Sequence, residues 1–243
     1  MIQRTLRLGS VLLVSMLLLA ACGGSVGTGD TTTPTPEPTA GDVIAEASTT
    51  IANAKSIHFN LKIEGDSYVD PAHTIRLLNA QGDLLRPDKV DVTFQVNLFG
   101  ASNATIRMIT IGDHSWTTDI LSGKWGPAPE EFGYNPSVLF DTQNGLGPVI
   151  GKLHDVKLEG TEEIGGRTAY KITGVASQND ISLLTAESMS GSSFPVQLWI
   201  DTETSQLLQI VLAEPEDSGK DHPATWTMRI SGYDEDISIE SPV

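Results

Sequence analysis

The chain has 243 residues and carries 31 Asp and Glu against 15 Lys and Arg, which gives a formal net charge of −16. Phosphate backbones and anionic membrane surfaces repel a chain this acidic, so we expect no nucleic-acid partner and no membrane contact through a basic patch. The only cysteine is Cys22, so an intramolecular disulfide is excluded and the fold must rest on packing alone.

The N-terminus has the pattern of a bacterial lipoprotein signal peptide. Arg4 and Arg7 precede an apolar run over residues 8–21, which is shorter than the roughly 20 residues that a membrane-spanning helix needs. The run ends in "LAAC", residues 19–22, which resembles a lipobox. That motif implies removal of the leader, residues 1–21, and diacylglyceryl and palmitate groups on Cys22. An ordinary secretory signal beside a chance cysteine is the alternative.

A polar segment rich in Gly, Ser, Thr and Pro follows the cysteine, with almost no apolar side chains around which to fold. We interpret residues 22–41 as the lipidated cysteine and a flexible tether, and residues 42–243 as a single domain. A domain of that length can enclose a sizeable core or cavity. The lipid on Cys22 would hold it at the outer face of the bacterial cytoplasmic membrane or in the cell envelope.

The domain begins with a predicted helix followed by a predicted strand. In "DVIAEASTTIANAK", residues 42–55, apolar side chains recur every three or four positions, and Asp42 is placed to cap the helix. The next stretch, "SIHFNLKIEGD" at residues 56–66, alternates strictly between apolar and polar side chains. This alternation predicts a strand with one buried face.

Similar alternation predicts further strands later in the chain, at residues 90–100, 104–112, 156–164, 168–176, 194–202, 206–214 and 224–233. Short turn-rich breaks between them favour hairpins. Weaker helical patterns occur at residues 135–156, as two short helices, and at residues 178–188, with Asn179 or Asp180 as the cap. We therefore predict an α+β fold with a large antiparallel sheet. The pattern leaves open whether the sheet curves around a cavity or is fully packed.

Several segments resemble the LppX/LprA/LprF/LprG family of bacterial lipoproteins. The resemblance rests on "SIHFNLKIEGD", "GDLLRPDKVDVTFQVNL", "YNPSVLFDTQNGLGPVIGKLHDVKLEGTEEIGGRTAYKITG" and "FPVQLWIDTETSQLLQIVL", in this order behind the lipobox. It implies a curved antiparallel sheet, a U-shaped half-barrel similar to LolA and LolB, with a few short helices on its concave face. It further implies an apolar cavity for lipid or glycolipid acyl chains, and lipid transport outward from the cytoplasmic membrane beside an export transporter.

The resemblance does not extend to residues 186–193 and 214–223, which are expected to shape the cavity mouth, so the identity of the lipid stays open. The candidate lipid-binding residues are the apolar side chains of the dry sheet face and of the helices that cover it: Phe59, Leu61, Ile63, Val92, Phe94, Val96, Ile106, Met108, Leu139, Val149, Ile150, Leu153, Leu183, Leu198 and Ile200.

The sequence carries no pattern that favours an enzyme. His154 and Asp155 form a lone pair without further metal-ligand partners, and the adjacent Glu162 and Glu163 would face opposite sides of a strand. There is no G-x-S-x-G motif. We expect no catalytic residue, metal or cofactor. The leading function is a lipid-binding and lipid-carrying surface lipoprotein, and the alternative is a packed, non-catalytic scaffold or transporter accessory in the envelope. A hydrolase is a distant third.

Overall fold

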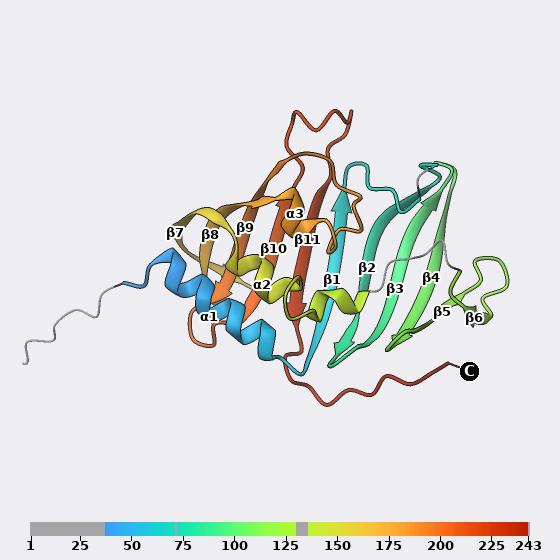
Figure 1. Ribbon diagram of the computed structural model, residues 1–243, viewed down its shortest axis with the longest axis horizontal. Helices are drawn as coiled ribbons and strands as arrows, with labels where there is room; N and C mark the ends of the chain where they lie inside the picture. The colour runs from blue at the N-terminus through green and yellow to red at the C-terminus, as the bar shows by residue number, and fades with distance from the viewer. Residues whose placement is uncertain (1–36, 71, 130–135, 243) are drawn as a thin grey trace, which may run out of the picture. The chain divides into compact units, whose positions relative to one another are not determined.

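An antiparallel sheet of eleven strands dominates the protein, shown as a computed structural model in Figure 1. The structure describes residues 37–70, 72–129 and 136–242, which belong to one compact unit. The predicted leader, the predicted lipidation at Cys22 and most of the predicted tether lie outside the described residues. Within the described part, no helix is long and apolar enough to span a membrane.

The strands form two series of hairpins, and a pairing between segments distant in sequence joins the two series in the middle of the open sheet. Their order across the sheet is β6-β5-β4-β3-β2-β1-β11-β10-β9-β8-β7, so the first strand pairs with the last. The strands are β1 Ser56–Glu64, β2 Ile75–Leu85, β3 Lys89–Leu98, β4 Ser102–Ile111, β5 His114–Thr118, β6 Trp125–Pro127, β7 His154–Ile164, β8 Arg167–Ser177, β9 Ser193–Asp201, β10 Leu207–Ala213 and β11 Thr225–Ser231.

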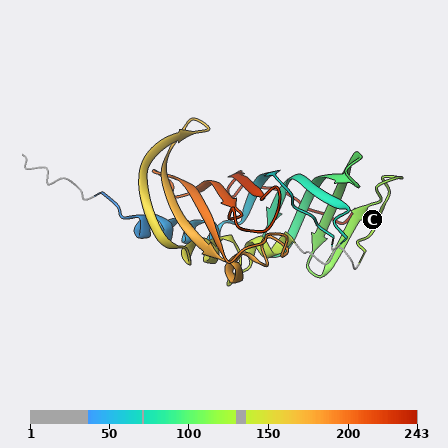
Figure 2. The same ribbon diagram turned by 90° about the horizontal axis from the view of Figure 1, so that it is seen from above.

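A few short helices pack on the concave face of this curved sheet (Figure 2). They are α1 Ala40–Asn53, the 3₁₀ helix η2 Pro136–Phe140, α2 Leu146–Gly151 and α3 Gln178–Ile181. The predicted fold class, an α+β half-barrel with helices on the concave face, is confirmed. The two short helices expected within residues 135–156 are present as η2 and α2.

The predicted helix caps were wrong by a few residues. Helix α1 begins at Ala40, and Thr39 rather than Asp42 is its N-cap. Thr39 and Asp42 form a capping box, because the Thr39 hydroxyl accepts the Asp42 N–H while the Asp42 carboxylate accepts the Thr39 N–H, each at 3.2 Å. The Thr39 hydroxyl also donates to the Asp42 carboxylate at 2.6 Å, and this bond, together with that from the Thr39 N–H, lowers the pKa of Asp42. For α3 the N-cap is Ser177, not Asn179 or Asp180, and the Ser177 hydroxyl donates to the Asp180 carboxylate.

Strand β2 was not among the predicted strands, and a bulge explains why. Its buried side chains are Leu77, Ala80 and Leu84, a spacing typical of a helix rather than a strand. The pairing with β3 shifts register between Leu77 and Asn79, and an extra residue at a bulge breaks the alternation of faces. Strands β5 and β6 are too short to give a periodic signal.

The register of the sheet places apolar side chains opposite one another across most of its strands. From β4 to β8 one such row contains Ile106, Phe94, Ala80, Leu61, Met228, Ile210, Leu198 and Ile172. These residues belong to, or pack against, the main buried cluster between the sheet and the helices. A much smaller buried cluster of Ala169, Trp199 and Leu208 lies apart from it.

Candidate functional site

A large hollow lies over the β1–β4 half of the sheet. This main cavity has a volume of about 480 Å³, and mostly apolar side chains line it. Strands β1 to β5 and β11 form one wall, while η2 and residues 182–188 form the other. Its lining comprises Phe59, Leu61, Val69, Leu77, Ala80, Val92, Phe94, Val96, Ile106, Met108, Thr117, Leu139, Ser182, Leu183, Leu184, Thr185, Ala186, Glu187, Ser188, Trp226 and Met228.

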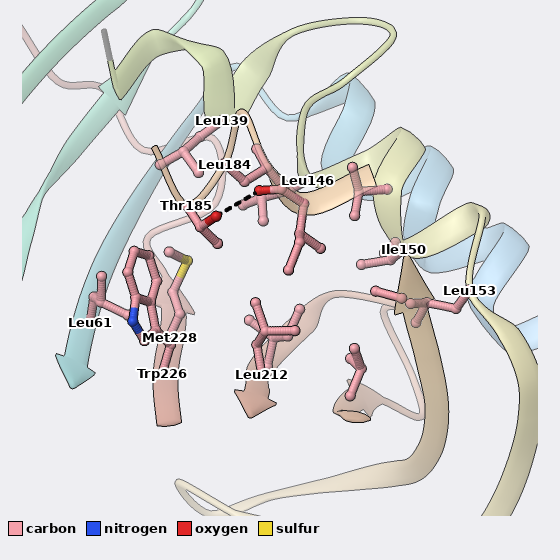
Figure 3. A pocket seen from close by; sticks show the side chains of 15 residues that line it. Leu61, Leu139, Leu146, Ile150, Leu153, Leu184, Thr185, Leu212, Trp226 and Met228 are labelled. Carbon is pink, nitrogen blue, oxygen red and sulfur yellow. Dashed lines mark hydrogen bonds between the residues drawn. The ribbon is translucent and has the colours of Figure 1, made fainter. Parts of the chain in front are cut away.

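A second, much smaller hollow of about 50 Å³ adjoins the first, and residues of α2 and α3 line it (Figure 3). We call it the annex. Six residues line both the annex and the main cavity, and we call this shared set the junction: Leu61, Leu139, Leu184, Thr185, Trp226 and Met228. In Figure 3, Leu139, Leu184 and Thr185 lie across from Trp226 and Met228.

Most of the candidate residues derived from sequence line one of these two hollows. Phe59, Leu61, Val92, Phe94, Val96, Ile106, Met108, Leu139 and Leu183 line the main cavity, and Val149, Ile150 and Leu153 line the annex with Leu61 and Leu139. Ile63, Leu198 and Ile200 are instead buried in the main apolar cluster, outside both linings. A lipid-binding role for all of the candidate residues stays a prediction.

The sequence reasoning missed lining residues from β2 and β11. Leu77 and Ala80 were missed with the irregular strand β2, while Trp226 and Met228 belong to a predicted strand whose facing partners the sequence did not reveal. Across the ladder, Met228 is opposite Leu61, and Trp226 is opposite Ile63. Their shared alternation with β1 is the only sequence signal that could have identified them.

Residues 182–188, which we call the rim segment, separate the main cavity from solvent. Leu183 lines the cavity and yet is 52% exposed, and Ala186 and Glu187 are also exposed lining residues. The rim segment is therefore an edge of the main cavity at which lining side chains reach solvent. Part of the segment 186–193, expected to shape the mouth, therefore does line the cavity.

A buried ion pair fastens the end of the rim segment. Lys220 donates to Glu214 at 2.6 Å and to the backbone carbonyl oxygens of Asp66 and Ser188, each at 3.0 Å. Glu214 also accepts the N–H of Ser190 at 2.7 Å. The loop 214–223, the second segment expected to shape the mouth, thus supports the rim from behind.

Arg86 positions the opposite wall. Its guanidinium donates to the carbonyl oxygens of Ala54 at 2.7 Å and Phe140 at 2.8 Å, and it lies 4.3 Å from the centre of the Phe140 ring. Burial lowers the pKa of Arg86. Because Leu139 precedes Phe140, these contacts fix a junction residue relative to α1.

The paired polar residues considered from the sequence do not line either hollow. His154 and Asp155 are 2.9 Å apart on an exposed surface, and neither is in the lining of the main cavity or of the annex. Glu162 accepts from Lys171 and Trp199, whereas Glu163 accepts from Thr168, so the two carboxylates have separate partners. In the part of the chain that is described, no group of three or more His, Cys, Asp or Glu could hold a metal ion.

A curved, open sheet with short helices over an apolar hollow defines the class of half-barrel lipoproteins. The family model for the LppX_LprAFG lipoproteins matches residues 39–239. The chain belongs to this family, which confirms the resemblance seen in its sequence.

Relatives and solved structures agree with this assignment. Lipoprotein LprA of Mycobacterium tuberculosis H37Rv is 23% identical over 247 residues, covering 96% of this chain and 95% of LprA. Lipoarabinomannan carrier protein LprG of Mycolicibacterium smegmatis is 24% identical over 239 residues, covering 96% and 94%. The crystal structure of LprF from Mycobacterium bovis has the same fold, with a TM-score of 0.67 and 16% identity over 84% of this chain and 96% of LprF. The crystal structure of Mycobacterium tuberculosis lipoprotein LppX matches with a TM-score of 0.59 and 18% identity, covering 84% of this chain and 100% of LppX.

Proposed function

We propose that this protein binds acyl lipids or glycolipids in the main cavity and carries them across the cell envelope while its own lipid anchor on Cys22 holds it at the membrane. The observation that carries the proposal is the hollow of about 480 Å³ over the β1–β4 half of the apolar sheet face. A packed scaffold has no need of such a space, because well-packed interiors contain few voids larger than a water molecule. The name of LprG, a lipoarabinomannan carrier, supports the same class of ligand.

The energetics of lipid transfer explain why the wall is apolar. Each methylene that leaves a bilayer costs about 0.8 kcal/mol in water, so two chains of about 16 carbons cost roughly 25 kcal/mol. A carrier has to replace most of that cost with apolar contacts. The face formed by Phe94, Val92, Met108 and their neighbours offers such contacts, and no catalytic step is required. An export transporter is a suitable partner for a carrier of this kind.

The size of the cavity indicates how much lipid fits without rearrangement. A methylene group is comparable in size to a water molecule, whose share of liquid volume is about 30 Å³. A cavity of about 480 Å³ is therefore of the order of one acyl chain rather than of a complete two-chain lipid. A second chain needs the annex to widen or the chain to lie along the open side of the cavity.

Filling the cavity tests the proposal. Val92 and Val96 are 1% and 2% exposed and line the main cavity, so Val92→Trp and Val96→Trp should abolish lipid loading while the protein still folds. Thr93→Trp is the matched control, because Thr93 lies between them on the other face of β3. Lipid occupancy is measured by native mass spectrometry, with circular dichroism as the folding control. Unchanged occupancy in folded Val92→Trp and Val96→Trp would rule out this face as the binding wall.

A further inference from the structure

One polar group at the junction has no hydrogen-bond partner among the described residues. It is the buried indole Nε1–H of Trp226. Trp226 lines both the main cavity and the annex. A buried donor without an acceptor is uncommon, because its loss of hydration is not compensated.

No neighbour of Trp226 among the described residues accepts its N–H. Within the junction, the side chains of Leu61, Leu139 and Met228 are apolar, and the Thr185 hydroxyl, which donates to the Ile181 carbonyl oxygen at 3.0 Å, makes no hydrogen bond with the indole. Trp199, by contrast, donates its Nε1–H to Glu162 at 2.8 Å. The missing acceptor therefore reflects the apolar surroundings of Trp226 at the junction, since another tryptophan of this protein does find one.

The position of the junction indicates which ligand atom could meet this donor. Leu184 and Thr185 belong both to the junction and to the rim segment, whose Ser182, Glu187 and Ser188 bring polar side chains to the cavity edge. The junction thus lies one layer inside the polar edge. In an acyl lipid, the carbonyl oxygen occupies the same level, between the polar headgroup and the first methylenes of the chain.

We propose that Trp226 is a specificity-determining residue whose Nε1–H donates a hydrogen bond to the carbonyl oxygen of an ester- or amide-linked acyl chain. The inference rests on the proposed function, since it needs a lipid in the cavity. On binding, the acyl carbonyl oxygen supplies the acceptor that the Trp226 N–H lacks in the empty protein. The preferred ligand class is then acyl lipids, in contrast to ether lipids of the same length, which lack this acceptor.

The test compares two probes that differ only in this group: 1-palmitoyl-lysophosphatidylcholine and 1-O-hexadecyl-lysophosphatidylcholine. Each is titrated against the full chain in detergent by native mass spectrometry. The wild-type protein should bind the ester probe about 3- to 10-fold more tightly than the ether probe, the range expected for one net hydrogen bond. Trp226→Phe keeps an aromatic ring but removes the N–H, so it should weaken ester binding by that factor and leave ether binding unchanged.

A second measurement examines the empty protein. Because Trp226→Phe removes a buried donor without a partner, its midpoint of urea unfolding should be equal to or above that of the wild type. The matched control is Trp199→Phe, which breaks the bond to Glu162, should lower the midpoint and should leave the ester preference intact.

Three outcomes overturn the inference. Equal loss of both probes in Trp226→Phe means that the indole acts by shape alone. Equal binding of the two probes by the wild-type protein means that no carbonyl is recognised, although the proposed lipid-binding function then still stands. Binding of neither probe by the wild type refutes the proposed function and, with it, the inference.

Discussion

The carboxylate of Glu214 and the ammonium of Lys220 lie 2.6 Å apart at a place where the Glu214 side chain has no exposed surface and that of Lys220 is 22% exposed. The second oxygen of Glu214 accepts the Ala224 N–H at 2.6 Å. Through this pair, the loop after β10 is bonded to Ser188, the last residue of the rim segment, and to Ser190 just after it. The ion pair thus connects the stability of the fold with the wall of the cavity.

Removal of the lysine should therefore destabilise the protein strongly. Lys220→Met leaves the buried Glu214 carboxylate without its cation, and we expect the free energy of unfolding to fall by about 3 kcal/mol, the lower end of the range for buried pairs because Lys220 is partly exposed. The double variant Glu214→Gln/Lys220→Met should recover part of this loss. Urea unfolding measures both. A loss below about 1 kcal/mol for Lys220→Met would place the pair among ordinary surface ion pairs.

Phe59 and Phe94 should respond differently to truncation. Both line the main cavity, but Phe59 is 3% exposed whereas Phe94 is only partly buried. In lipid-free protein, Phe59→Ala should lower the free energy of unfolding by about 3–5 kcal/mol, the cost typical of a packed phenylalanine. Phe94→Ala should cost clearly less, because a side chain that faces empty space has fewer contacts to lose. Equal and large losses at both positions would count against an open cavity.

Asp201 should give the protein a specific sensitivity to acid. Burial raises the pKa of Asp201, but hydrogen bonds from Thr204, Arg167 and Glu203 outweigh it and hold the pKa below its usual range. A lowered pKa in the folded state stabilises the protein above the unfolded value of about 3.9, and this contribution disappears as the pH falls through the folded pKa.

Asp201→Asn removes the ionisable carboxylate and with it this pH-dependent contribution to stability. We expect the variant to lose about 1–3 kcal/mol of stability at pH 7, and the difference from wild type to shrink as the pH is lowered below about 4. Unfolding in urea at a series of pH values measures both effects. A difference between the two proteins that is independent of pH would show that the charge of Asp201 does not contribute.

Cys22→Ser tests the predicted anchor. Only a thiol can accept the thioether-linked diacylglyceryl group, and Cys22 is the only cysteine in the chain. The variant should therefore accumulate as an uncleaved or soluble precursor, as judged by cell fractionation and by labelling with radioactive palmitate. A processed, lipid-labelled Cys22→Ser protein in the membrane fraction would exclude the lipobox interpretation.

The sequence alone determined which strands have a regular, half-buried face. Strand β1 alternates without interruption, so Phe59 and Leu61 could be assigned to the apolar face before their partners were known. Periodicity is a local property, and it is reliable where each residue follows the pleat. It failed at β2, where the bulge between Leu77 and Asn79 interrupts the pleat. It also failed at the helix starts, where the N-caps Thr39 and Ser177 lie two or three positions before the expected residues.

Only the tertiary structure decided where the apolar face is packed and where it is hollow. Leu198 and Leu61 have the same pattern in sequence and lie in one cross-strand row, yet Leu198 is covered in the core whereas Leu61 lines both hollows. The difference arises because short helices distant in sequence cover one part of the sheet more closely than the other. Likewise, the unpaired Trp226 N–H and the bonds from Lys220 to Asp66 and Ser188 depend on contacts across the whole chain. A cavity is the volume that non-local packing leaves unfilled, and local patterns of residues do not encode that volume.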